Sequence, residues 1–234
     1  MKTASALRME ARVAGFLYLA IMISAFFAEG MVRGGLVADG NAAETAKRIL
    51  ASESLYRLGG GADLIAVLCD VALAALFYDL LKPAGRALAL LMAFFRLAYA
   101  AVFAVVALLH FAPLSVLTGH GLTSLPAQQA EAIAYLMIRL HTLGYNVALT
   151  LFGVHCVLLG ALIARSGFLP AVLGWLLALV GVCYLVNSAT HLVFTSVDFF
   201  PWILLPGLLG EGGLTLWLLI FGINAEKWQA RAAA

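Results

Sequence analysis

The sequence places ionisable side chains inside long apolar segments, where they could act as acids, bases or ligands. The carboxylates Asp63 and Asp70 are separated by two helical turns, which puts them about 20° apart on one helical face. Glu211 lies among glycines in a later apolar segment. An ionisable side chain within a bilayer is costly unless it is paired or hydrated, so each one is a functional candidate. Such carboxylates could serve as general acid and base or carry protons.

Three other apolar segments each carry one polar stripe at helical spacing. The stripes are Arg96 with Tyr99 and His110, His141 with Tyr145 and His155, and Tyr184 with Asn187 and His191. The first stripe falls within about 60° of a helical wheel and the second within about 80°. Together with Asp63 and Asp70 the stripes occupy four helices. In the simplest arrangement these helices face one another around a shared polar pocket.

Roles follow from the side-chain chemistry. The predicted catalytic residues are carboxylates and their histidine proton partners, namely Asp63, Asp70, Glu211, His141 and His155. The predicted binding residues are Arg57, Arg96, Tyr99, Tyr145, Tyr184 and Asn187. For Asp70 and Arg96, a structural buried ion pair is the favoured alternative to a catalytic role.

Histidines at similar predicted depth raise the question of a metal. His110, His141 and His191, with Asp63 or Glu211, could hold zinc and leave a position for an activated water. Two of these histidines on facing helices could instead ligate haem iron, which is a weaker match. Hydrogen-bonded histidines that bridge helices are the alternative to both.

The elements that position these residues must be membrane helices. Of the 234 residues, 64% are hydrophobic and only 11% are charged, and the mean hydropathy is +1.03. A soluble domain usually has about 25% charged residues. This composition excludes a soluble enzyme, a disordered chain and a nucleic-acid binder that relies on basic patches.

Six stretches approach the length of about 20 apolar residues that a bilayer core requires. They cover about 13–32, 58–81, 87–111, 144–164, 168–194 and 200–223. We therefore predict an all-α, polytopic transmembrane bundle forming a single domain over residues 1–234. Residues 41–52 and 126–140 are predicted to form two short interfacial helices on the outer side, the first capped by Asn41 and Glu44.

Basic residues predict the orientation, because short cytoplasmic loops are enriched in them. One side would carry Lys2, Arg8, Arg12, Lys82, Arg86, Arg165, Lys227 and Arg231. The exception is the first outer loop, which carries Arg33, Lys47 and Arg48. Both termini are thus predicted to be cytoplasmic, in a bacterial inner membrane. The polar stripes then lie at the midplane or in the outer half, and the predicted pocket opens outward.

Glycines predict where two of these helices pack closely. Gly153 and Gly160 are spaced by two helical turns, as are Gly174 and Gly181 in the next apolar segment. Small residues at this spacing let helix backbones approach in a membrane.

Two sets of short motifs are similar to a known family. The first set is Glu53-Ser-Leu-Tyr-Arg57, Asp63, Cys69-Asp70 and Phe94-Phe95-Arg96; the second is His141, Gly144-Tyr145, Phe152-Gly-Val-His155-Cys156 and Arg165-Ser-Gly-Phe-Leu-Pro170. Together they resemble the bacterial membrane-protein family named domain of unknown function 4386, from the first span through the fifth. The resemblance implies a six-helix membrane fold and assigns no activity. It implies that Arg57, Asp63, Asp70, Arg96, His141, Tyr145 and His155 are family positions, whereas His110 and His191 fall outside the pattern.

The leading functional hypothesis is an intramembrane pocket that binds a small or lipid-like molecule, with catalysis left open. The alternatives are a metal-dependent intramembrane hydrolase, a proton-coupled transporter, and a non-catalytic structural or regulatory subunit. The expected partners are the lipid bilayer and a hydrophobic or lipid ligand, and no nucleic acid is expected.

Overall fold

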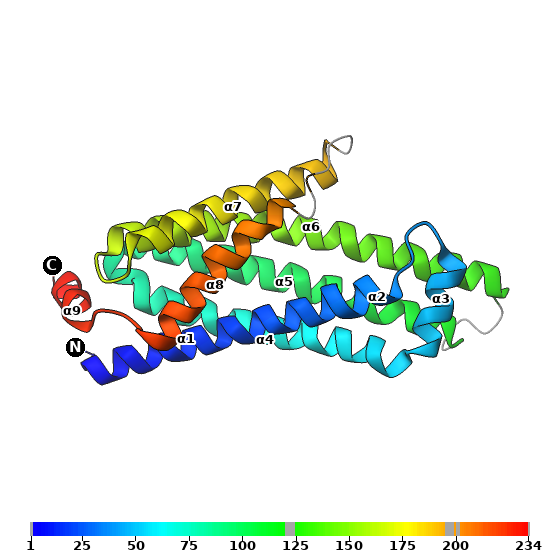
Figure 1. Cartoon of the computed structure of the whole chain (residues 1–234), viewed down its shortest axis with the longest axis horizontal. Coiled ribbons are helices and arrows are strands. Elements are labelled where there is room, and N and C mark those ends of the chain that lie inside the picture. The colour runs from blue at the N-terminus through cyan, green and yellow to red at the C-terminus, as the bar shows by residue number, and fades with distance from the viewer. Residues whose placement is uncertain (1, 120–124, 195–198, 200–201, 234) are drawn as a thin grey trace. The chain divides into compact units, whose positions relative to one another are not determined.

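The computed structural model describes residues 2–119, 125–194, 199 and 202–233, and every regular element among them is a helix (Figure 1). The elements are α1 (Ala4–Ala25), η1 (Phe26–Arg33), α2 (Gly34–Leu36), α3 (Ala42–Ala51), α4 (Glu53–Leu81), η2 (Lys82–Ala84), α5 (Arg86–Leu117), α6 (Ala127–Ser166), α7 (Ala171–Leu192), η3 (Trp202–Leu204), α8 (Leu205–Ile220) and α9 (Ala225–Ala233). The segment η1 is a π-helix, and η2 and η3 are 3-10 helices. The all-α prediction is confirmed.

Among the described residues, five helical segments are long and apolar enough to cross a membrane. They are Ala4–Leu36, Glu53–Ala84, Arg86–Leu117, Ala127–Ser166 and Ala171–Leu192. A sixth candidate combines α8 and α9, which are bent by 99° at the break between them. The protein is therefore a multi-pass membrane protein with five or six candidate spans. The predicted start of the last span, Phe200, lies outside the described residues.

The two predicted short helices have different outcomes. The first is present as α3, and Asn41 caps it by accepting a 2.9 Å hydrogen bond from the Glu44 backbone N–H. The second is not a separate helix, because residues 126–140 run into the fourth span as the 40-residue α6. The predicted break near Gly144 was wrong. A Cβ on Gly144 would lie 2.6 Å from Val106 Cγ2, so this glycine allows close packing within an unbroken helix.

The chain divides into two compact units. Unit 1 comprises Met1–Ala20, Cys69–Ala100 and Asn146–Ala234, and unit 2 comprises Ile21–Leu68 and Ala101–Tyr145. The helices α1, α4, α5 and α6 each contribute residues to both units. A single transmembrane domain over the whole chain stays a prediction.

In unit 1, α6 and α7 pack through glycines. A Cβ on Gly174 would lie 2.5 Å from the Gly160 carbonyl oxygen, and a Cβ on Gly181 would lie 2.5 Å from the Gly153 carbonyl oxygen. Figure 1 shows α7 alongside α6, with α8 packed against α7. The predicted glycine contact is confirmed.

The terminal segments meet at one end of unit 1 (Figure 1). Gln229 Nε2 on α9 donates a 2.9 Å hydrogen bond to the Lys2 carbonyl oxygen. This arrangement agrees with two termini on the same side of the membrane. Which side they occupy stays a prediction.

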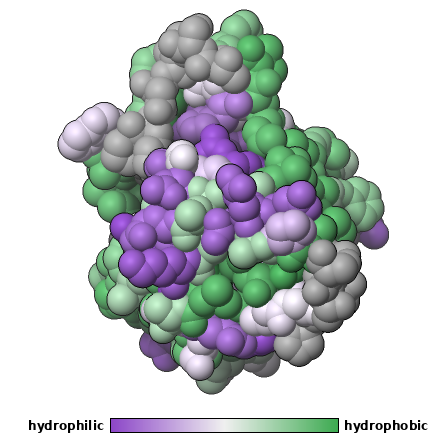
Figure 2. All heavy atoms as spheres, turned by 90° about the vertical axis from the view of Figure 1, so that its right-hand side faces the viewer, coloured by the Kyte–Doolittle hydropathy of each residue, from purple (hydrophilic) through white to green (hydrophobic). Residues whose placement is uncertain are grey.

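At the end of unit 2 that carries α3, hydrophilic residues gather among hydrophobic ones (Figure 2). Two of the basic residues that broke the orientation rule are paired here. Arg48 Nε lies 2.9 Å from Glu44 Oε1, and Arg33, as described below, lies in a buried ion pair. Both arginines are therefore held in ion pairs with carboxylates.

Candidate functional site

A fully buried ion pair lies in unit 1 between α4 and α5. Arg96 Nη2 is 2.5 Å from Asp70 Oδ1, and both side chains are 0% exposed. The other carboxylate oxygen, Asp70 Oδ2, and Arg96 Nε have no hydrogen-bond partner among the described residues. The two charges attract each other, and one atom on each side of the pair is left without a partner among the described residues.

His155 on α6 holds the other side of the Arg96 guanidinium. Its Nε2 is 2.9 Å from Arg96 Nη1, and its Nδ1 is 3.0 Å from the Met92 carbonyl oxygen. A neutral ring protonated on Nδ1 satisfies both contacts, because Nδ1–H then donates to Met92 and Nε2 accepts from Arg96. His155 thus positions the arginine.

Aromatic rings enclose the guanidinium. Its central carbon lies 5.0 Å from the ring centroid of Tyr18, 5.3 Å from that of Phe152 and 5.8 Å from that of Phe77. Rings at this distance attract a cation through their quadrupole.

A second carboxylate joins this cluster through Tyr18. Glu211 on α8 accepts a 2.9 Å hydrogen bond from the Tyr18 hydroxyl and another from the Tyr184 hydroxyl. Gly207 makes room for this contact, since a Cβ there would lie 2.7 Å from the Tyr184 hydroxyl oxygen. We call Asp70, Arg96, His155, Tyr18, Glu211 and Tyr184 the unit 1 cluster.

A different buried arginine organises unit 2. Arg33, at the end of the π-helix η1, donates from Nη1 to Asp63 Oδ2 at 2.6 Å and from Nη2 to Asp63 Oδ1 at 3.0 Å. Its Nε donates to Glu29 Oε2 at 2.5 Å. Every nitrogen of this guanidinium has a carboxylate partner. A bidentate pair of this kind is the strongest geometry available to arginine and carboxylate.

His110 also contacts this arginine. We call Glu29, Arg33, Asp63, His110 and Tyr56 the unit 2 cluster. His110 Nδ1 is 3.0 Å from Arg33 Nη1, and its Nε2 is 2.8 Å from the Tyr56 carbonyl oxygen. The Tyr56 ring stacks on it at 4.2 Å between centroids. Gly60 lets the imidazole approach α4, because a Cβ there would be 2.7 Å from His110 Cδ2.

Both clusters fall inside a family match. Residues 13–222 match the family described as Domain of unknown function (DUF4386). The chain belongs to the DUF4386 family. The chain is also similar to an uncharacterized protein of Archaeoglobus fulgidus, 28% identical over 156 residues that cover 67% of this chain and 78% of the relative. No solved structure matches.

The family match confirms the resemblance that the motifs predicted. Tyr18, Arg33 and Glu211 lie within the matched residues, so the DUF4386 region includes the helices that build both clusters. The archaeal relative shows that similar proteins are not confined to bacteria.

Of the three histidines predicted to bind zinc, His110 and His141 lie in unit 2 and His191 lies in unit 1. Among the described residues, no three His, Cys, Asp or Glu side chains form a group that could hold a metal ion. Both nitrogens of His110 are occupied by Arg33 and Tyr56, so His110 has no lone pair to offer zinc or haem iron. His191 belongs to unit 1, and its Nδ1 lies 3.0 Å from the Asn187 carbonyl oxygen.

His141 lies beside His110 in unit 2. Their ring centroids are 6.1 Å apart, and His141 is 2% exposed. Its Nε2 has no hydrogen-bond partner among the described residues. His141 is therefore the one predicted catalytic histidine of unit 2 with an unengaged ring nitrogen.

The remaining predicted binding residues take several positions. Tyr99 packs on Phe152 at 4.8 Å between centroids in unit 1. Asn187 Nδ2 donates to Asn146 Oδ1 at 3.1 Å in the same unit, while Tyr145 contacts Phe103 in unit 2. Arg57 belongs to neither cluster, because its exposed side chain pairs with Glu53 one turn earlier on α4.

The sequence did not identify four residues that shape the clusters, namely Tyr18, Phe77, Phe152 and Arg33. Arg33 was assigned to an outer loop, although its position four residues after Glu29 is a signal for an ion pair along a helix. Tyr18 is the only tyrosine in the first apolar segment, which is a weaker signal. The polar stripes were predicted to share one pocket on the second to fifth spans. In the structure the first and last membrane helices also contribute, and each unit has its own cluster.

Proposed function

We propose that this DUF4386 protein binds a small or lipid-like molecule at the unit 1 cluster, within the cytoplasmic membrane. The observation that carries the proposal is that Asp70 Oδ2 and Arg96 Nε have no hydrogen-bond partner among the described residues, although both side chains are completely buried. Nearly all buried polar atoms in proteins are paired, and leaving one unpaired costs about 1–3 kcal/mol. A buried pair with one such atom on each side is a candidate for a functional site.

The unit 2 cluster supports this assignment by contrast. Arg33 and Asp63 are the same residue types in a buried pair, yet all their polar groups form hydrogen bonds. A satisfied network is what a structural role requires. The difference between the two pairs therefore favours unit 1 as the functional site and unit 2 as a structural clamp.

The chemistry of the pair suggests the class of ligand. Arg96 Nε would donate to a carbonyl or carboxylate oxygen, and Asp70 Oδ2 would accept from a hydroxyl. The rings of Tyr18, Phe77 and Phe152 suit an apolar body. We infer a ligand with one oxygen-bearing polar group on a hydrophobic scaffold. If the ligand is transformed, Asp70 and Glu211 are the acid–base carboxylates, and Tyr18 links Glu211 to the Arg96 partner of Asp70.

A non-catalytic structural role is the second candidate. It is favoured by the close approach of Arg96 to Asp70 at 2.5 Å and by the contact of His155 with the same guanidinium. In that case the pair would serve only to hold α4, α5 and α6 together.

The two candidates are separated by ligand content and stability measured on the same variants. Wild-type protein, Asp70→Asn, Arg96→Gln and the double variant are purified in a mild detergent, and bound molecules are identified by native mass spectrometry. The matched control is the double variant Asp63→Asn with Arg33→Gln, which alters the satisfied pair.

The binding proposal expects a copurified molecule in the wild type and the control, and its loss in the Asp70/Arg96 double variant. The structural alternative expects each single variant to be unstable, the double variant to regain stability, and bound molecules to be unchanged. That second pattern would overturn the proposed binding site.

A further inference from the structure

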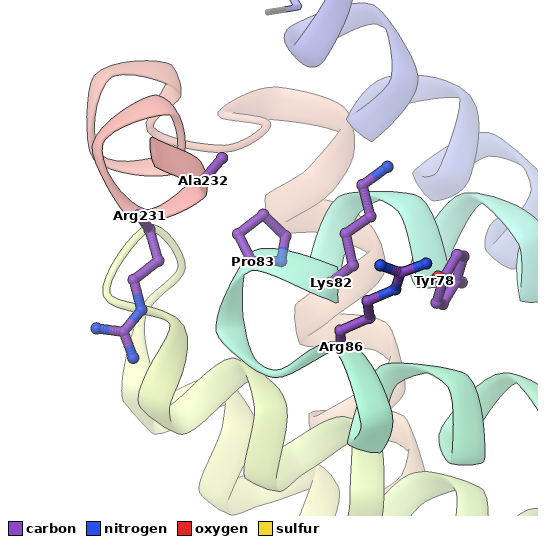
Figure 3. Close-up of a pocket in the computed structure, with 6 residues that line it drawn as sticks. All are labelled: Tyr78, Lys82, Pro83, Arg86, Arg231 and Ala232. Atoms are coloured by element: carbon purple, nitrogen blue, oxygen red, sulfur yellow. The ribbon is translucent and has the colours of Figure 1, made fainter. Parts of the chain in front are cut away.

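A basic pocket lies at the end of unit 1 that carries both terminal segments. It has a volume of about 480 Å³ and is lined by Tyr78, Lys82, Pro83, Arg86, Arg231 and Ala232 (Figure 3). These residues come from the end of α4, from η2, from the start of α5 and from α9. The pocket therefore lies at the ends of two candidate membrane spans, at the level expected for lipid headgroups.

The charge of this pocket is one-sided. Three cationic side chains line it and no carboxylate does. Lys82 is compensated, because it pairs with Asp79, which also binds Lys2. Arg86 and Arg231 form no ion pair or hydrogen bond with any residue that the structure describes. Two guanidinium groups without an ion-pair partner among the described residues thus line the pocket.

The helix that carries Arg231 is held at the pocket by a buried tryptophan on the same helix. Trp228, one turn earlier on α9, is 4% exposed, and its Nε1 donates a 2.7 Å hydrogen bond to the Leu80 carbonyl oxygen at the end of α4. Asn224 caps α9 by accepting from the Lys227 backbone N–H at 3.0 Å. The C-terminal helix is therefore docked against η2, and Arg231 is part of a defined surface.

Figure 3 shows how the two arginines are placed. Arg86 extends beside Tyr78 on one side of Pro83, and Arg231 descends from α9 on the other side. Both side chains are exposed, so their guanidinium groups can rotate toward one ligand. The planar guanidinium binds phosphate oxygens in a bidentate manner, and aromatic residues such as Tyr78 are enriched at the membrane interface.

The geometry points to a binding site for a phosphate group, contributed by the headgroup of an anionic phospholipid. Basic pockets between membrane helices bind such headgroups, and each basic residue near a membrane surface contributes about fivefold in affinity. A soluble phosphate compound has the same chemistry, so the experiment has one arm for each source. The site is separate from the unit 1 cluster and does not depend on the function proposed for it.

The test measures lipid binding to purified full-length protein by native mass spectrometry. The protein is titrated with phosphatidylglycerol and with phosphatidylcholine of the same acyl chains. The key variant is Arg86→Gln with Arg231→Gln. The control is Arg165→Gln with Lys227→Gln, which removes the same charge from exposed residues that do not line the pocket.

Wild-type protein should prefer phosphatidylglycerol, and the Arg86/Arg231 variant should bind it roughly twentyfold more weakly, while the control keeps its affinity within about twofold. Arg86→Lys with Arg231→Lys should lie between the two, because charge is kept and the bidentate geometry is lost.

In the second arm, inorganic phosphate and glycerol 1-phosphate are added. Displacement of the lipid at similar concentrations would assign the site to a soluble phosphate instead. Equal binding of phosphatidylglycerol by the key variant and the control would overturn the inference.

Discussion

Tyr18 donates a 2.9 Å hydrogen bond from its hydroxyl to Glu211 Oε2, although 193 positions separate the two residues in the chain. The ring of Tyr18 also lies 5.0 Å from the guanidinium carbon of Arg96. One tyrosine therefore links a carboxylate on α8 to the cation on α5. This link turns separate polar residues into one cluster.

The substitution Tyr18→Phe removes the hydroxyl and keeps the ring. Glu211 is only 7% exposed, so the loss of a donor should lower the free energy of unfolding by about 1–3 kcal/mol. Thermal unfolding in detergent, followed by circular dichroism, measures the change. Tyr78→Phe is the matched control, since Tyr78 is half-buried and makes no hydrogen bond with any described residue. An equal loss of stability in both variants would contradict the role given to Tyr18.

The substitution Asp63→Asn should be among the most destabilising changes in unit 2. It leaves the Arg33 guanidinium buried without its bidentate partner, and breaking a buried pair in this way costs about 3–5 kcal/mol. Asp39→Asn is the control, because the Asp39 side chain is 93% exposed and lies 3.9 Å from Arg139. An exposed pair contributes about 0–1 kcal/mol. Comparable unfolding transitions for the two variants would show that the Arg33 network is not a clamp.

Replacement by alanine should have opposite effects at Gly174, in the contact between α6 and α7, and at Gly61, which has free space on α4. In Gly174→Ala the new Cβ would lie 2.5 Å from the Ala164 backbone nitrogen, so the helices must separate and stability must fall. In Gly61→Ala nothing lies within 4 Å of the new Cβ, and alanine should stabilise α4 by about 0.5–1 kcal/mol. The unfolding temperatures of the two variants in one detergent should move in opposite directions. Tolerance of Gly174→Ala would mean that the helices pack less closely than described.

Membrane orientation is tested by labelling single cysteines in intact cells, with Cys69, Cys156 and Cys183 first replaced by alanine. If the termini are cytoplasmic, a membrane-impermeant maleimide should label Asp39→Cys in intact cells. It should label Ala230→Cys only after the cells are permeabilised. The reverse pattern would place the α9 end outside.

Part of the candidate site was accessible from the residue pattern alone. Asp70, Arg96, His155 and Glu211 stood out because an ionisable residue in an apolar segment needs a partner, and each of them has one. The capping of α3 by Asn41 and the glycine contact between α6 and α7 were predicted for equally local reasons. We predicted that 126–140 would be a separate helix, but it continues into the fourth span as part of α6. Nothing in that stretch of sequence requires a break.

The sequence by itself determined that this is a helical membrane protein, because an apolar composition requires a lipid environment and helices satisfy their backbone groups there. It also determined the DUF4386 family, because the short motifs occur in order along the chain. Only the tertiary structure decided that Arg33 pairs with Asp63 while Tyr18 meets Glu211. Helical periodicity gives the direction of a side chain about its own helix axis. It does not say which distant helix lies in that direction, and that choice depends on how the helices pack.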